Sequence, residues 1–205
     1  MSKTLVKICG LRSYEAARIA VEAGAAFIGF VFVPSSRRYI DPEEAARIVN
    51  ALPPSPVKAV GVFVDAPPEE VNRIAAICRL DFVQLHGREN AAYAAEINPP
   101  IIKAYRYGDD FSAEAANEYP ADYILLDSFS HGQAGGTGKT FAWRQAAAEA
   151  GRLERPLIVA GGLNVGNVAA AVEIFHPFAV DVSGGVEEDG RKSPDKIKEF
   201  CESLA

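Results

Sequence analysis

The feature of this chain that most constrains its fold is a regular alternation between short apolar segments and longer amphipathic ones. The apolar segments are unbroken rather than alternating, as residues 26–32 show, and this pattern is typical of strands buried on both faces of a parallel sheet. Helix signals separate them, for example Asp41-Pro42-Glu43-Glu44, which supplies a cap, a proline and acidic residues in the first turn. The pattern predicts an α/β protein with a parallel sheet.

The alternation repeats eight times without a break in composition. The predicted strands are residues 5–10, 26–32, 57–64, 81–85, 100–104, 122–126, 156–160 and 178–182. Eight units favour a single compact (β/α)8 barrel, the TIM barrel, spanning residues 1–205, with an open doubly wound sheet as the alternative. The chain is short for this barrel, so we expect a reduced fifth helix within residues 106–119, whereas residues 89–97 are predicted to form a full fourth helix.

Composition excludes several function classes. Lys and Arg number 21 against 27 Asp and Glu, a net charge of −6, which argues against a general nucleic-acid surface but leaves room for a local basic pocket. The three cysteines are odd in number and far apart, so neither a disulfide framework nor a metal site is expected, and a reducing, cytoplasmic setting is favoured. The chain has no apolar run of membrane-spanning length and no leader-like start, so we expect no membrane partner.

Reactive side chains follow several predicted strands, and in a barrel these strand ends meet at one mouth. Cys9 ends the first strand and Asp127 the sixth, while His86 follows the fourth. The sulfur is interpreted as a proton-transfer group in its thiolate form, and the apolar residues before Asp127 favour its protonated form. The alternatives are a small buried hydrophobe at Cys9, a solvated carboxylate at Asp127 and a structural role for His86.

Weaker candidates lie nearby. Asp65 and Asp181 also follow or end strands. Lys7 is not expected to reach Cys9, on the view that strand alternation turns it elsewhere. Either Arg37 or Arg38 supplies a cation.

Two late glycine loops predict an anion site. Gly161-Gly162 follows the seventh strand and Ser183-Gly184-Gly185 the eighth. Glycine lets backbone N–H groups approach phosphate oxygens, and barrels commonly hold phosphate at these two loops. Ordinary turn glycines are the alternative.

The glycine-rich loop at residues 132–140 ends in Gly138-Lys139-Thr140. A nucleotide-binding phosphate loop needs glycine five residues before Gly138, where this chain has Gln133. We therefore reject an ATPase and expect a lid over the site.

Taken together, these segments resemble the phosphoribosylanthranilate isomerase family over nearly the full length of the chain. The stretches that carry the resemblance are Lys7-Ile8-Cys9-Gly10, Gly29-Phe30-Val31-Phe32, Ser36-Arg37-Arg38-Tyr39, Gly61-Val62-Phe63-Val64, Val83-Gln84-Leu85-His86-Gly87, Leu125-Leu126-Asp127-Ser128, Gly135-Gly136-Thr137-Gly138-Lys139-Thr140-Phe141, Ala160-Gly161-Gly162-Leu163-Asn164 and Phe178-Ala179-Val180-Asp181-Val182-Ser183.

The resemblance implies a cofactor-free and metal-free Amadori rearrangement in tryptophan biosynthesis, acting on a small phosphorylated substrate in a monomer or homodimer. Cys9 would be the general base and Asp127 the general acid. The implied substrate-binding residues are Arg38 for a carboxylate, His86, and Gly162, Asn164, Ser183, Gly184 and Gly185 around the phosphate.

The chain departs from the family at one position in this set. The family usually has two serines after the eighth strand, whereas here Gly184 follows Ser183. Rival interpretations are a barrel isomerase for another sugar phosphate and a protein that only binds a phosphorylated ligand.

Overall fold

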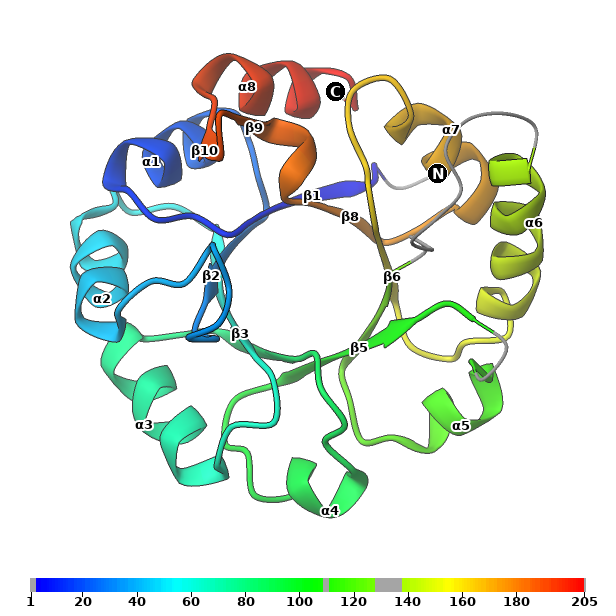
Figure 1. Cartoon of the computed structure of the whole chain (residues 1–205), viewed down its shortest axis with the longest axis horizontal. Coiled ribbons are helices and arrows are strands. Elements are labelled where there is room, and N and C mark those ends of the chain that lie inside the picture. The colour runs from blue at the N-terminus through cyan, green and yellow to red at the C-terminus, as the bar shows by residue number, and fades with distance from the viewer. Residues whose placement is uncertain (1–2, 109–110, 128–137, 205) are drawn as a thin grey trace.

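The structure, a computed structural model, describes residues 3–108, 111–127 and 138–204. Its centre is a closed barrel in which each strand pairs in parallel with the next and β8 pairs with β1 (Figure 1). The strands are β1 (Leu5–Cys9), β2 (Phe27–Val31), β3 (Lys58–Phe63), β4 (Phe82–Leu85), β5 (Ile101–Arg106), β6 (Tyr123–Asp127), β7 (Leu157–Ala160) and β8 (Ala179–Val182). The predicted barrel is confirmed, and the open-sheet alternative is wrong.

Helices form a ring around the strands, as Figure 1 shows. They are α1 (Tyr14–Glu22), α2 (Pro42–Ala51), α3 (Pro68–Cys78), α4 (Ala91–Ala94), α5 (Ala113–Glu118), α6 (Gly138–Ala150), α7 (Val168–Phe175) and α8 (Pro194–Glu202). The expected short fifth helix is confirmed. None of the helices in the described ranges has the length and apolarity of a membrane span.

The prediction of a full fourth helix over residues 89–97 is wrong, because α4 has only four residues. Glu89 lies before the helix. Its side chain is buried and accepts hydrogen bonds from the backbone N–H groups of Asp65 and Gly87. Asn90 then caps the helix through Tyr93 N. At the other end, the hydrogen-bond pattern changes to the tighter i→i+3 type, from Glu96 N to Tyr93 O and from Ile97 N to Ala94 O.

The barrel interior is filled by layers of side chains. The first layer is aromatic and comes from the starts of even-numbered strands, as barrel geometry requires. Phe27, Phe82, Tyr123 and Phe178 contact one another there, with ring centroids 5.2 to 6.4 Å apart. This layer closes the N-terminal end, so any cavity inside the barrel has to open at the other end.

A short antiparallel hairpin, β9 (Glu187–Glu188) and β10 (Arg191–Lys192), follows β8 and a 3-10 turn, η1 (Gly184–Val186). The hairpin has no counterpart among the predicted elements. It lies beside the end of β8 and extends toward α1 and α8 (Figure 1).

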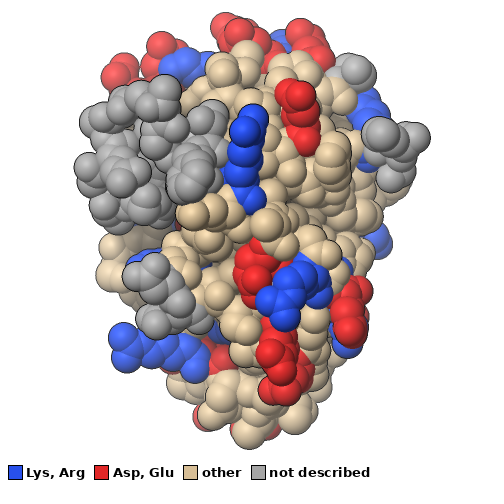
Figure 2. Space-filling view, turned by 90° about the vertical axis from the view of Figure 1, so that its right-hand side faces the viewer, with Lys and Arg blue, Asp and Glu red and all other residues tan. Residues whose placement is uncertain are grey.

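One face of the molecule carries charges of both signs. In Figure 2 acidic and basic side chains lie among one another on the face shown. This distribution agrees with the net charge of −6 and differs from the clustered basic face of a nucleic-acid-binding protein.

Candidate active site

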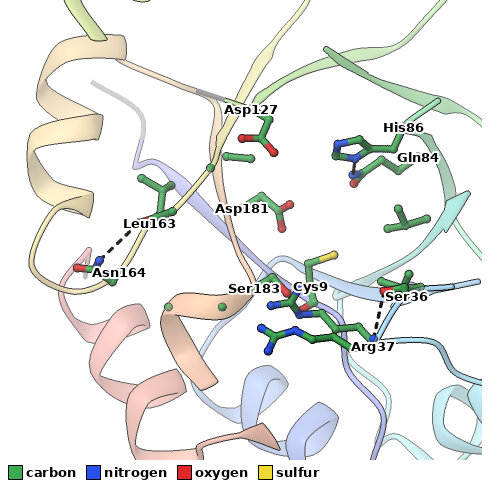
Figure 3. A pocket seen from close by; sticks show the side chains of 18 residues that line it. Cys9, Ser36, Arg37, Gln84, His86, Asp127, Leu163, Asn164, Asp181 and Ser183 are labelled. Atoms are coloured by element: carbon green, nitrogen blue, oxygen red, sulfur yellow. Dashed lines mark hydrogen bonds between the residues drawn. The ribbon is translucent and has the colours of Figure 1, made fainter. Parts of the chain in front are cut away.

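A cavity of about 700 Å³ opens at the C-terminal ends of the barrel strands. Its lining includes all nine site residues predicted from the sequence (Figure 3). They are Cys9, Arg38, His86, Asp127, Gly162, Asn164, Ser183, Gly184 and Gly185. The fold therefore brings together residues spread over most of the chain, while their individual roles stay predictions.

Cys9 is the last residue of β1. Its side chain lines the cavity, although the residue is buried and only 7% of its surface is exposed. Its register partner on β2 is Gly29, and a Cβ atom there would lie 2.9 Å from the Cys9 sulfur. Glycine at position 29 thus leaves the space that the sulfur occupies. Burial raises the pKa of the Cys9 thiol, against the opposing effect of the Lys7 ammonium.

Lys7 corrects one expectation from the sequence. Residues two apart on a strand face the same side, so Lys7 points into the barrel below Cys9 rather than away from it. Its side chain is fully buried, and its Nζ donates a hydrogen bond to Asp181 Oδ1 at 3.0 Å. Burial alone would lower the pKa of the Lys7 ammonium, but the Asp181 carboxylate and the Cys9 sulfur raise it. The lysine is therefore charged.

Asp127 ends β6, and His86 directly follows β4. Both line the cavity together with Gln84, which was missed in the sequence (Figure 3). Burial lowers the pKa of His86, so its imidazole is neutral near pH 7. Gln84 Nε2 lies 3.1 Å from His86 Nδ1. With the amide as donor, the ring proton is on Nε2.

Arg38 is held at the cavity by more hydrogen bonds than Arg37. The Arg38 guanidinium donates from Nε and Nη2 to the two carboxylate oxygens of Glu187, at 2.6 and 3.0 Å. Arg37 reaches the same carboxylate, but its side chain is 65% exposed against 26% for Arg38. Lys192, buried on β10, donates to Glu187 Oε1 at 3.0 Å and to Ser183 O at 2.8 Å. The unpredicted hairpin thus anchors both Arg38 and the end of β8.

The two glycine loops lie against each other. A Cβ atom on Gly185 would come within 1.9 Å of the Leu163 carbonyl oxygen, so only glycine lets the backbones after β7 and β8 approach this closely. Asn164 lies before α7, which begins at Val168. Asn164 closes a turn through a hydrogen bond from Gly166 N to its Oδ1.

Asp65 is separate from this site, contrary to the weaker expectation. Its backbone is left-handed, with φ of 49°, and its Oδ1 accepts from Arg88 N at 2.6 Å. It lines a neighbouring cavity of about 540 Å³ with Lys103 and Glu89, which form a buried ion pair at 2.7 Å. The lid predicted for residues 132–140 has its core, residues 132–137, outside the described part of the chain.

Three residues that the sequence analysis missed, set aside or ranked low share one signal. Lys7, Gln84 and Asp181 stand two positions before Cys9, His86 and Ser183, respectively. The period of two along a strand places each pair on the same interior face. Counting two positions back from each predicted site residue at a strand end therefore identifies the polar side chains beneath the cavity mouth.

The donor set does not resemble a metal centre. Within residues 3–108, 111–127 and 138–204, no three His, Cys, Asp or Glu side chains are grouped as metal ligands would be. All three cysteines are free and buried. The independence from metals and cofactors stays a prediction.

Comparison with known proteins identifies the family. The model of a family described as N-(5'-phosphoribosyl)anthranilate (PRA) isomerase matches residues 6–203. This chain belongs to that family. The match spans β2 to β8, all but the first residue of β1, and both glycine loops, so the resemblance drawn from short motifs in the sequence is confirmed.

Curated relatives and solved structures agree with this assignment. An N-(5'-phosphoribosyl)anthranilate isomerase of Desulforudis audaxviator is 50% identical over 199 residues, covering 96% of each chain. The crystal structure of phosphoribosyl anthranilate isomerase from Thermotoga maritima superposes with a TM-score of 0.87 at 43% identity, covering 98% of both chains. Another solved family structure, with a TM-score of 0.85 and 41% identity over 98% of each chain, holds reduced 1-(o-carboxyphenylamino)-1-deoxyribulose 5-phosphate.

Proposed function

We propose that this protein catalyses the Amadori rearrangement of N-(5-phosphoribosyl)anthranilate to 1-(2-carboxyphenylamino)-1-deoxyribulose 5-phosphate, a step of tryptophan biosynthesis, with Asp127 as general acid and Cys9 as general base. The observation that carries the residue assignment is that both side chains line one cavity with the paired glycine loops. The rearrangement is an isomerisation that needs no external oxidant, reductant or group donor, so an acid, a base and an anchor for the substrate account for the chemistry.

The first step opens the sugar ring. Asp127 donates its proton to the furanose oxygen, the bond between C1 and that oxygen breaks, and the nitrogen lone pair forms a protonated Schiff base. In the second step the Cys9 thiolate removes the proton from C2. The C–H electron pair becomes the C1–C2 double bond and neutralises the nitrogen, and the resulting enolamine tautomerises to the ketone. General acid and base steps each contribute roughly 10²- to 10⁴-fold to the rate.

Two anchors orient the substrate for these steps. The glycine loops after β7 and β8 suit the phosphate, because backbone N–H groups can approach its oxygens closely there. Arg38 suits the anthranilate carboxylate: Glu187 occupies its Nε and Nη2 edge, which leaves the Nη1 side of the fork for a second carboxylate. The neutral His86 ring adds a hydrogen-bond donor on the opposite wall.

Substitution of the two proton-transfer residues tests the proposal. Cys9→Ser and Asp127→Asn keep the side-chain shapes, so both variants are expected to fold and to lose at least about 100-fold in kcat. Turnover is followed by the fluorescence of the anthranilate group. Gln145→Ala, on the exposed side of α6, serves as the control and should retain full activity.

The result that overturns the acid–base assignment is a rate within a few-fold of wild type in either variant. A sugar phosphate that lacks the anthranilate ring is the second arm of the experiment. Faster turnover of that substrate would contradict the proposed substrate, and product binding without turnover in the wild type would indicate a binding protein.

The proposal includes a small phosphorylated substrate as the partner and a cytoplasmic setting, which the three free cysteines favour. Either a monomer or a homodimer is compatible with it. One solved family structure is of monomers generated from the dimeric phosphoribosylanthranilate isomerase of Thermotoga maritima. Light scattering of the purified protein distinguishes the two states.

A further inference from the structure

A buried ion pair lies directly beneath the sulfur of Cys9. Lys7 and Asp181 are register partners on the neighbouring strands β1 and β8, and Lys7 Nζ donates to Asp181 Oδ1 at 3.0 Å. The Lys7 side chain is fully buried, and the Asp181 side chain is 10% exposed at the cavity. Removing two charges from water costs about as much free energy as their attraction returns, so stability alone does not explain an ammonium at this position.

The two members of the ion pair have opposite effects on the ionisation of Cys9. Among the charged groups around the sulfur, Lys7 has the largest effect and favours the thiolate, while Asp181 opposes it. Lys192 on β10 adds a weaker effect in the same direction as Lys7. Because Lys7 lies two residues before Cys9 on the same interior face, its distance from the sulfur is set by the strand itself.

Among the titratable groups that face the cavity, Lys7 has the main influence on the ionisation of Cys9. Lys192 and Arg38 are both engaged by the Glu187 carboxylate. His86, from the end of β4, is neutral because burial lowers its pKa. Asp127 lies at the end of β6, whereas Asp181 lies on β8, the strand next to Cys9 (Figure 3).

We propose that Lys7 is a positioning residue for catalysis: its ammonium, held in place by Asp181, stabilises the thiolate of Cys9 that removes the substrate proton. Asp181 limits this stabilisation, so that the thiolate remains basic enough to take a proton from carbon. The inference rests on the proposed general-base role of Cys9, but its test reads the sulfur itself and needs no turnover.

The test measures the alkylation rate of Cys9 by iodoacetamide as a function of pH, because only the thiolate reacts. Mass spectrometry of the Cys9 peptide separates it from Cys78 and Cys201, whose pKa values burial raises to about 11. Three variants are compared with wild type: Lys7→Met, Asp181→Asn and the combination of the two. The combination removes both charges and leaves no unpaired ion in the interior.

The two single substitutions are expected to act in opposite directions. Loss of a nearby charge shifts an ionisation by a unit or more, so Lys7→Met should slow the alkylation of Cys9 at pH 7 by about tenfold. Asp181→Asn should accelerate it by a similar factor, and the double variant should fall between the two. Structural damage would move both single variants in the same direction.

Lys103→Met is the matched control, because Lys103 is the other buried lysine paired with a carboxylate, Glu89. It lines the neighbouring cavity rather than the one that holds Cys9. Its alkylation profile should equal that of wild type. Far-UV circular dichroism establishes that each variant is folded before its rate is compared.

Equal alkylation rates in folded wild type, Lys7→Met and Asp181→Asn would overturn the inference, as would changes of the same sign. If Lys7→Met does not fold, the comparison of Asp181→Asn with the double variant decides: the inference fails unless the double variant reacts more slowly. A wild-type rate in Cys9→Ser would instead refute the base assignment and leave the measured effect of Lys7 on the sulfur intact.

Discussion

Arg37 and Arg38 are adjacent in the sequence but have different surroundings in the structure. Glu187 holds Arg38 through both of its oxygens, whereas Arg37 reaches one of them from a largely exposed position. A forked hydrogen-bond pair fixes the plane of a guanidinium. Arg38 therefore has the guanidinium whose orientation is fixed for a ligand. The sequence had left the choice between Arg37 and Arg38 open.

Replacement of these arginines by lysine tests that choice. Arg38→Lys keeps the charge but loses the fork, so we expect KM for the anthranilate substrate to rise about tenfold, equivalent to about 1.4 kcal/mol of binding free energy. Arg37→Lys is the matched control and should change KM by less than about twofold. Steady-state kinetics gives both values, and a larger effect at Arg37 would reverse the assignment.

Gly184 tests the phosphate side of the cavity. A Cβ atom at this position would lie 3.4 Å from Arg38 Nη2, so a small side chain fits without moving the backbone. Gly184→Ser introduces the hydroxyl that the family usually has there, and a hydrogen bond to a charged group contributes about 1.5 kcal/mol or more. We expect KM to fall several-fold with kcat unchanged.

Gly184→Ala separates the hydroxyl from the added carbon. It places the same Cβ atom without a donor, so KM should stay at the wild-type value. An equal fall in KM for alanine and serine would show that backbone stiffening rather than a new hydrogen bond is responsible.

Among the elements, the β9–β10 hairpin contributes most to the site without having been predicted. It presents Glu187 and Lys192, whose side chains are 7% and 5% exposed, respectively. Burial alone would raise the pKa of Glu187, but hydrogen bonds from Arg38 and Lys192 lower it to about 2. The hairpin is two residues long on each side and has no apolar pattern, so its formation depends on these side-chain contacts.

The depressed pKa of Glu187 makes stability depend on pH in the acidic range. An unfolded glutamate titrates near 4.5 and the folded one near 2, so the stabilisation is complete above pH 4.5 and is lost as pH falls toward 2. Glu187→Gln should lower the free energy of unfolding by about 2 kcal/mol at pH 7, and the difference from wild type should shrink between pH 5 and pH 3.

Urea unfolding at several pH values measures this difference. Glu188→Gln is the control on the same hairpin. The Glu188 side chain is 67% exposed, and its ion pair with Lys196 is long, at 4.0 Å. The substitution should leave stability nearly unchanged. A difference between wild type and Glu187→Gln that is constant from pH 7 to pH 3 would contradict the ion-pair explanation.

At the scale of the whole molecule, function depends on closure of the barrel. The contact between β1 and β8 joins residues more than 170 positions apart and places Lys7 beside Asp181. Ser183 Oγ also donates to the Cys9 carbonyl oxygen at 3.0 Å across the same seam. Opening the seam would break the ion pair and separate the sulfur from both Asp181 and the glycine loop after β8.

A chain ending at residue 178 tests the importance of closure. It lacks β8, the hairpin and α8, so β1 and β7 become unpaired edges. We expect loss of cooperative thermal unfolding and of native near-UV circular dichroism. A chain ending at Glu202, the last residue of α8, is the control and should unfold cooperatively. Native-like melting of the shorter chain would contradict a requirement for closure.

Much of the fold and part of the site could be predicted from the sequence, because the signals are local. Unbroken apolar segments, caps and glycines specify strands, helices and turns within a few residues of each other. The polar and glycine residues at the strand ends then mark the mouth of the barrel, and Cys9, Asp127 and the two glycine loops were found in this way. The predicted start of the fourth helix at Glu89 was wrong because the side chain of that residue pairs with Lys103, 14 positions further along the chain.

The sequence by itself determined the alternation of strands and helices and the residues that reach the cavity from the strand ends. Only the tertiary structure decided what surrounds those residues. Lys7 meets Asp181, and Arg38 meets Glu187, across about 150 to 174 positions of sequence. Such pairings depend on the register between the strands and on barrel closure, which bring distant segments into contact, and no local pattern encodes that register.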